Sequence, residues 1–159
     1  MKILYLDFNG VLHDGMVMRN RKRGMYLTNP ERSFFEWMPI LEELLAPHPD
    51  VKIVLSTSWV RALGFDATRQ ELTEELRTRV IGSTFHHPKL LQSEFDIMPR
   101  GMQIWNDVEQ RKPDSWFAID DDVFGWPAWC RDRLIETKGS LGLSDEATQD
   151  AVRKMLAAL

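Results

Sequence analysis

Three short apolar runs of the sequence each end in side chains that carry oxygen. These side chains are Asp7 and Asn9 after residues 2–6, Ser56 and Ser58 after residues 51–55, and Asp120 and Asp121 after residues 116–119. Oxygen ligands without histidine or cysteine favour Mg²⁺ over zinc or copper, and Mg²⁺ in proteins usually joins one or two carboxylates to a substrate phosphate. The residues therefore predict a Mg²⁺ site for a phosphate compound, on the condition that the fold brings them together.

The elements that must position these residues follow from the hydrophobic pattern. Each apolar run is typical of a buried strand, and helical patterns lie between the runs. This alternation predicts a mostly parallel sheet with helices on both faces, the three-layer α/β/α class. Ligands of such open sheets bind outside the carboxyl ends of the strands, where the polar residues stand. Weaker strand patterns occur at residues 80–83 and 134–137.

Capping signals predict helices between and after these strands. Pro39 suits the first turn of one helix, and Thr68 with Glu71 forms a capping box at the start of another. A third pattern runs from residue 101 to residue 112 and ends before a proline. Ser144 is the expected N-cap of a last helix.

Length and composition restrict the class of protein. The chain has 159 residues, of which 43% are hydrophobic and 28% charged, so we expect one globular domain over residues 1–159. A formal net charge of −4 gives no global basic field, so a nucleic acid would have to be recognised locally. The one cysteine, Cys130, excludes an intramolecular disulfide and a multi-cysteine zinc site. No apolar run approaches the roughly 20 residues of a membrane helix, and we expect a cytoplasmic protein.

The stretch over residues 13–34 has no clear structural pattern and is locally basic. Its cationic residues are Arg19, Arg21, Lys22 and Arg23. One interpretation is a solvated hairpin tip, because runs of charge are usually exposed. The other is a flap in which Arg21 and Arg23 help to hold an anionic substrate. Either way the stretch is too short for a large cap over the site, and an open site suits a large substrate.

The ordered motifs resemble those of the haloacid dehalogenase (HAD) superfamily of phosphotransferases. The four matching segments are Asp7-Phe8-Asn9-Gly10-Val11-Leu12, Leu55-Ser56-Thr57-Ser58-Trp59, Arg100 before a helix, and Ile119-Asp120-Asp121-Asp122. With Trp126-Pro127, they are more narrowly similar to the small phosphatase-like domains of "Swiss army knife" RNA-repair proteins. The resemblance covers nearly the whole chain and implies a Rossmann-like fold without a large cap.

The resemblance also implies roles for the acidic residues. Asp7 would be the nucleophile, forming an aspartyl-phosphate, while its other oxygen binds Mg²⁺. Asp121 would complete the metal site, with Asp120 either a second ligand or an orienting neighbour. The doubled aspartate leaves this register open.

Further residues of the motifs would surround the phosphoryl group. Ser56 would donate a hydrogen bond to it, and Arg100 would neutralise its charge, with Lys89 and Lys112 as alternative cations. The remaining candidates for substrate binding are Phe8, Gly10, Thr57, Ser58 and His13. Ser56, Thr57 and Ser58 also suit the cap of the following helix.

Asn9 departs from the family pattern, in which this position is an aspartate that serves as general acid and base. An amide has no titratable proton near neutral pH, although the backbone carbonyl of Asn9 can still bind the metal. Losing general acid–base assistance costs about 10²–10⁴-fold in rate. Four explanations stay open: a slow or non-catalytic natural protein, replacement by His13 or Asp14, a deliberate substitution that traps substrate, or deamidation of Asn9-Gly10.

Two functions of different kinds follow. The first is a Mg²⁺-dependent phosphatase acting on a phosphorylated substrate such as a nucleic-acid terminus, with activity reduced by Asn9. The alternative is a non-catalytic module that binds phosphate or nucleic acid on the same fold. A small-molecule phosphatase is a third, disfavoured by the missing cap.

Other polar and aromatic residues receive structural interpretations. His86 and His87 are adjacent and would point to opposite faces of a strand, so they do not suit one metal ion. The tryptophans are interpreted as core residues, with base stacking by Trp59 and Trp126 as the alternative.

Overall fold

The computed structural model describes residues 1–85 and 91–159, and in this part of the chain a five-stranded sheet has the order β5-β4-β1-β6-β7. The strands are β1 (Lys2–Leu6), β4 (Val51–Leu55), β5 (Val80–Ser83), β6 (Ser115–Asp120) and β7 (Leu134–Glu136). All of their ladders are parallel. The strand predictions are confirmed, including the two weaker ones.

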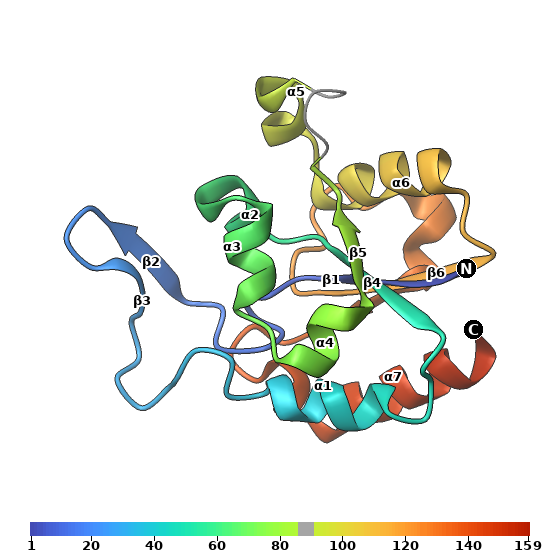
Figure 1. Cartoon of the computed structure of the whole chain (residues 1–159), viewed down its shortest axis with the longest axis horizontal. Coiled ribbons are helices and arrows are strands. Elements are labelled where there is room, and N and C mark those ends of the chain that lie inside the picture. The colour runs from blue at the N-terminus through green and yellow to red at the C-terminus, as the bar shows by residue number, and fades with distance from the viewer. Residues whose placement is uncertain (86–90) are drawn as a thin grey trace.

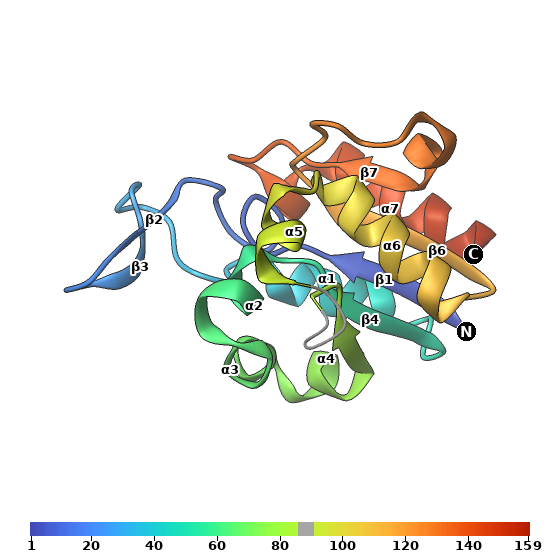
Figure 2. The ribbon, with the colours of Figure 1, turned by 90° about the horizontal axis from the view of Figure 1, so that it is seen from above.

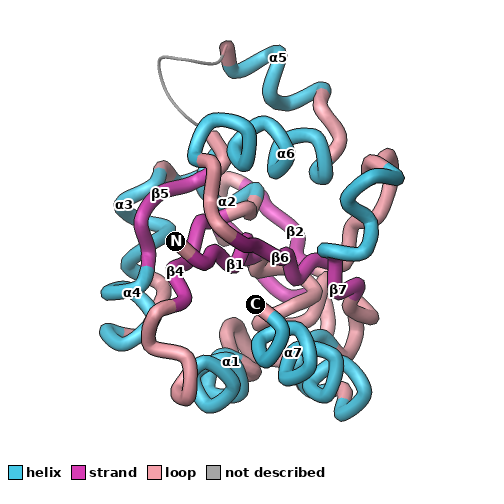
Figure 3. Tube along the Cα trace, turned by 90° about the vertical axis from the view of Figure 1, so that its right-hand side faces the viewer, coloured by secondary structure: helices cyan, strands magenta, loops and turns pink. Residues whose placement is uncertain are grey.

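Helices cover both faces of the sheet (Figure 1, Figure 3). They are α1 (Met38–Leu45), α2 (Ser58–Leu63), α3 (Phe65–Gln70), α4 (Glu74–Arg79), α5 (Gln92–Ile97), α6 (Arg100–Arg111) and α7 (Glu146–Ala158). Figure 3 shows α1 and α7 below the sheet and α6 above it. Alternate side chains of β1 enter different core clusters, since Leu4 and Leu6 pack with α1 and α7 while Ile3 and Tyr5 pack with α6. The predicted three-layer α/β/α class is confirmed.

Two predicted helix starts are wrong. Thr68 does not begin a helix with Glu71, because it lies inside α3, where its buried hydroxyl donates to the Gly64 carbonyl at 2.7 Å. Asp145, rather than Ser144, caps α7, and its carboxylate accepts the backbone N–H three residues on at 3.2 Å. In both places several polar neighbours suit a cap, and the packing of the helix selects among them.

The stretch over residues 13–34 forms the predicted hairpin, made of β2 (Val17–Asn20) and β3 (Gly24–Leu27). Figure 2 shows it standing away from the body of the molecule. Its basic residues Arg19, Arg21, Lys22 and Arg23 are exposed. Over the described residues, no further insertion covers the carboxyl ends of the strands, and no helix there is long and apolar enough to cross a membrane.

The tryptophans do not all belong to the core. Trp59 and Trp126 are buried, as are Trp37 and Trp116, but Trp129 is 63% exposed. The core interpretation is therefore wrong for Trp129. Cys130 is a free thiol, as expected for the one cysteine of the chain, and it is buried.

Candidate active site

The carboxyl ends of two neighbouring central strands, β1 and β6, bring the predicted acidic residues together. Asp7 follows β1, and Asp120 ends the neighbouring β6, with Asp121 directly after it. Among the described residues, these three aspartates form the group that could hold a metal ion, with one ligand atom from each within 4.8 Å of the others. Their hard oxygen atoms fit Mg²⁺ or a similar cation.

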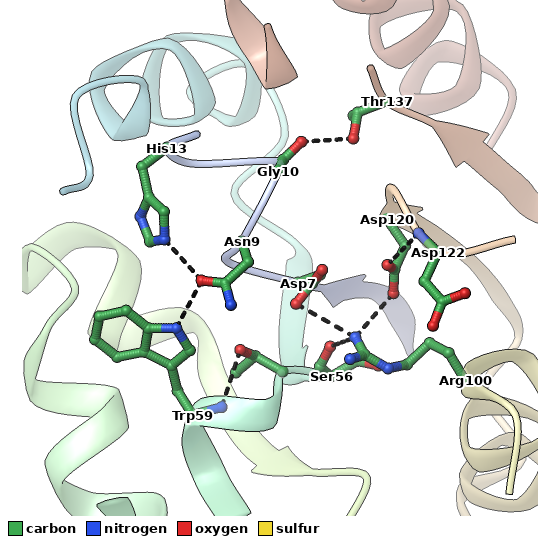
Figure 4. A network of polar contacts seen from close by, with 11 residues as sticks. Asp7, Asn9, Gly10, His13, Ser56, Trp59, Arg100, Asp120, Asp122 and Thr137 are labelled. Carbon is green, nitrogen blue, oxygen red and sulfur yellow. Dashed lines mark hydrogen bonds and ion pairs between the residues drawn. The ribbon is translucent and has the colours of Figure 1, made fainter. Parts of the chain in front are cut away.

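Arg100 stands at the first position of α6 and points into this acidic group (Figure 4). Its Nη1 lies 3.3 Å from Asp7 Oδ1 and 2.9 Å from Asp120 Oδ2, and it also donates to the Ser56 carbonyl. Burial by itself would lower the pKa of Arg100, but the adjacent carboxylates raise it above its usual range, so the guanidinium stays charged. The structure thus places Arg100 next to the nucleophile candidate, and its role as the cation stays a prediction.

Of the two alternative cations, Lys112 is not placed here. Lys112 is the C-cap of α6, a helix of 12 residues, so about 18 Å of helix separates it from Arg100. Lys89 lies outside the described residues, as do His86 and His87.

One arginine does not compensate three carboxylates. Burial, followed by the charge of Asp7, raises the pKa of Asp121 to about 7. The same two causes raise the pKa of Asp120 well above its usual range, although Arg100 acts in the opposite direction. The site therefore has an excess of negative charge that either protons or a divalent cation relieve, which is a property expected of a Mg²⁺ site.

Ser56 has an unused donor in this buried setting. Its side chain is 1% exposed, and its hydroxyl has no hydrogen-bond partner among the described residues. A buried hydroxyl without a partner is costly, so a bound ligand that accepts from it would be stabilised. The neighbouring Thr57 already caps α2 by accepting from the Trp59 N–H at 3.3 Å, and Ser58 is exposed.

The turn after β1 requires glycine at position 10. Gly10 has a φ of 76°, and a Cβ added there would collide with the carboxylate of Asp121. Its carbonyl accepts from the hydroxyl of Thr137 at 2.6 Å, which ties the turn to the end of β7. The sequence prediction does not include Thr137 among the site residues, although a polar residue at the end of the weak strand pattern over 134–137 is the signal that marks it.

Asn9 is held by two neighbours (Figure 4). Its Oδ1 lies 2.8 Å from Trp59 Nε1 and 2.9 Å from His13 Nε2. The other ring nitrogen of His13, Nδ1, accepts from the Phe35 backbone N–H at 3.2 Å. An accepting Nδ1 assigns the proton to Nε2, so His13 donates to Asn9. Burial lowers the pKa of His13 to about 4, which keeps the ring neutral at physiological pH.

Other predicted substrate contacts lie in the buried core or on the hairpin. Phe8 and His13 are fully buried, and the ring of Phe8 packs against Phe35 and Trp59. Arg21 and Arg23 lie on the projecting hairpin. Asp14 is buried, and its carboxylate accepts from a backbone N–H of the hairpin stem.

An open depression of about 290 Å³ lies beside the aromatic residues that flank Asn9. It is lined by Met25, Phe34, Phe35, Trp59, Leu63 and Glu71. Trp59 therefore connects this depression with Asn9, since its indole N–H contacts the Asn9 amide. The sequence offered no sign that residues 25, 34 and 63 meet here.

Comparison with known proteins gives one finding. A family model described as "HAD domain in Swiss Army Knife RNA repair proteins" matches residues 3–148. No curated protein and no solved structure matches the chain. The matched range includes every residue of the acidic group, Arg100 and the hairpin.

Proposed function

Since the chain belongs to the family of HAD domains in Swiss Army Knife RNA repair proteins, we propose that it is a Mg²⁺-dependent phosphohydrolase that works through an aspartyl-phosphate. The observation that carries this proposal is the convergence of Asp7, Ser56, Arg100 and the Asp120-Asp121 pair at one end of the sheet. Three carboxylates beside one arginine and an unused serine donor suit a metal ion and a phosphoryl group.

Each residue of this group has a distinct task in the proposal. Asp7 attacks the phosphorus atom. Ser56 Oγ donates to an oxygen of the phosphoryl group, and the Arg100 guanidinium, 3.3 Å from Asp7 Oδ1, neutralises charge on its equatorial oxygens. Asp7, Asp120 and Asp121, with the Asn9 carbonyl, would hold Mg²⁺, which when bound lowers the repulsion between the nucleophile and the anionic substrate.

We further propose a phosphorylated nucleic-acid terminus as the substrate. The described residues contain no cap over the site, so a polymer end can approach it. The exposed basic residues of the hairpin offer contacts to a phosphate backbone, and the aromatic depression beside Trp59 offers a surface for a base. The family description, which refers to RNA repair, agrees with this substrate class.

Asn9 favours a second candidate, a module that binds phosphorylated ends without turning them over. The amide cannot donate a proton to a leaving group or take one from water. Such a module would bind a phosphorylated RNA in the presence of Mg²⁺ and release no phosphate, whichever residue occupies position 9.

Phosphate release from an aryl phosphate distinguishes the two candidates. Wild type and Asn9→Asp are assayed with and without Mg²⁺, and residue 9 of each is verified by mass spectrometry. The phosphohydrolase proposal expects Mg²⁺-dependent release that rises about 10²–10⁴-fold in Asn9→Asp. The double variant Asp7→Asn/Asn9→Asp is the matched control and should be inactive. No release by Asn9→Asp would favour the binding module.

A further inference from the structure

We propose that this site is selective for phosphoryl groups whose leaving group departs as a stable anion, such as a phosphoanhydride or an acyl phosphate, and that phosphorylated Asp7 accumulates during turnover. Phosphate monoesters of alcohols would be poor substrates. The inference rests on the proposed function, because it concerns the same nucleophile. It follows from the way the protein holds Asn9.

The side-chain oxygen of Asn9 is fully occupied by protein donors. An amide oxygen accepts up to two hydrogen bonds, and here the Trp59 indole N–H and the His13 Nε2–H supply both, at 2.8 and 2.9 Å. The orientation of the amide is thereby fixed, and Nδ2 is turned away from the two donors. The side chain of residue 9 therefore presents only N–H groups to a substrate at Asp7.

The neighbours of Asn9 do not replace the missing acid and base. His13 is fully buried, its Nδ1 accepts from the Phe35 N–H, and its Nε2–H donates to Asn9, so both ring nitrogens are in use. The Trp59 indole only donates. Asp14 Oδ1 accepts from the Met16 N–H at 2.8 Å in the hairpin stem. Asp120 and Asp121 belong to the candidate metal site.

The first chemical step then depends on the leaving group. An oxygen of Asp7 forms a bond to phosphorus, the bond from phosphorus to the leaving oxygen breaks, and its electron pair stays on that oxygen. A phosphate or carboxylate, whose conjugate acid has a pKa of about 4–6, departs as an anion and accepts a hydrogen bond from Asn9 Nδ2. An alkoxide is as basic as hydroxide and needs a proton that residue 9 does not have.

The second step lacks its base. A water molecule attacks the phosphorus of the aspartyl-phosphate, the bond to the Asp7 oxygen breaks with its electron pair returning to the carboxylate, and the proton of the water passes to the phosphate product or to solvent. With Asn9 in place, no side chain described in residues 1–85 and 91–159 is placed to remove that proton as the water attacks. Hydrolysis of the aspartyl-phosphate is therefore slower than its formation from a good leaving group, and the phosphorylated protein accumulates.

Two RNAs of the same sequence test the leaving group directly. One carries a 5′-triphosphate, whose terminal phosphoryl group is an anhydride, and the other a 5′-monophosphate, whose leaving group is a primary alcohol. Acetyl phosphate serves as a small acyl phosphate. Wild type should release the leaving groups, the 5′-diphosphate RNA and acetate, with an initial burst near one per chain, and release phosphate from both substrates without a burst. It should act on the monophosphate at least about 10²-fold more slowly. Asn9→Asp should lose the burst and most of this selectivity.

The outcomes separate the inference from the proposed function. If neither protein releases phosphate from acetyl phosphate, the proposed function fails. Two other outcomes, each with an active Asn9→Asp, overturn only the inference. In the first, wild type is inactive on all three substrates, and in the second, wild type shows the same selectivity as Asn9→Asp.

A spectroscopic measurement tests the geometry without catalysis. In a long-range ¹H–¹⁵N spectrum of wild type, His13 should show a protonated Nε2 and an unprotonated Nδ1. The opposite tautomer would leave the Asn9 oxygen free to accept from a substrate or water, and would overturn the inference. Trp59→Phe, which removes one donor but keeps an aromatic ring, should change the side-chain amide signals of Asn9 if the contact exists in solution.

Discussion

Replacing Arg100 with methionine tests whether this residue compensates the buried carboxylates. Methionine keeps an unbranched apolar stem but removes the charge. In wild type the Arg100 side chain is 15% exposed and lies between Asp7 and Asp120, which are 5% and 1% exposed. Removing one partner of such a buried pair usually costs about 3–5 kcal/mol, because the remaining charge has no compensation.

The size of the effect on thermal unfolding follows from the length of the chain. One kcal/mol shifts the Tm of a domain of this size by about 2–4 °C, so Arg100→Met should lower the Tm of the metal-free protein by about 6–20 °C. The loss should be smaller with saturating Mg²⁺, because the cation compensates the same carboxylates. It should also be smaller at low pH, because the raised pKa values of Asp120 and Asp121 let them take up protons.

Differential scanning calorimetry of metal-free and Mg²⁺-saturated samples measures this effect. The control is Arg153→Met, which breaks the ion pair with Asp150 on the surface of α7, where the side chains are 55% and 66% exposed. Exposed pairs contribute less than about 1 kcal/mol, so this Tm should change by no more than about 4 °C. If Arg100→Met were as stable as the control without metal, Arg100 would not be holding the carboxylates together.

Three further variants test other parts of the site. Folding raises the pKa of Asp121 from 3.8 to about 7, so the folded state binds this proton more tightly than the unfolded state does. The resulting stabilisation of the metal-free protein is fully present below about pH 4 and is lost as the pH rises through 7. Since Mg²⁺ needs the carboxylate, the increase in Tm on adding Mg²⁺ should grow from about pH 5.5 to about pH 8, and Asp121→Asn should abolish this trend. Gly10→Ala should lower the Tm, because position 10 has a positive φ, and should weaken Mg²⁺ binding in a calorimetric titration, because the new Cβ meets the carboxylate of Asp121. An unchanged Mg²⁺ affinity would contradict the close approach of Gly10 to Asp121. The logarithm of the association constant for single-stranded RNA falls as the logarithm of the salt concentration rises, and alanine at all four basic positions of the hairpin should make this slope less steep by as much as about 3. An unchanged slope would show that the hairpin does not contact the RNA. Those positions are Arg19, Arg21, Lys22 and Arg23.

The central strands and the acidic group were predictable because both depend on local sequence. A buried parallel strand needs a continuous apolar run, and its carboxyl end needs residues that bind a ligand, so Leu6 before Asp7 and Ile119 before Asp120 reveal strand and site together. Arg100 was predicted through the motif resemblance, which implies a cation just before a helix. Its contacts with both Asp7 and Asp120 follow once α6 packs over β1 and β6.

The environment of Asn9 was not predictable, because it depends on contacts between distant segments. Trp59 is 50 positions away along the chain, and Phe35, which fixes the tautomer of His13, adopts a positive φ that no glycine announces. The helix starts near Thr68 and Ser144 failed for a related reason. Several polar residues there suit a cap equally well in isolation, and only the packing of each helix selects one.

Locating a phosphoryl group on Asp7 tests the central claim most directly. Wild type is mixed with acetyl phosphate and Mg²⁺, quenched in acid, digested and analysed by tandem mass spectrometry, with Asp7→Asn treated in parallel. The account predicts a phosphorylated peptide whose modification maps to Asp7, is removed by hydroxylamine as an acyl phosphate should be, and is absent from Asp7→Asn. A phosphoryl group on another residue, or hydrolysis of acetyl phosphate that persists in Asp7→Asn, would contradict it.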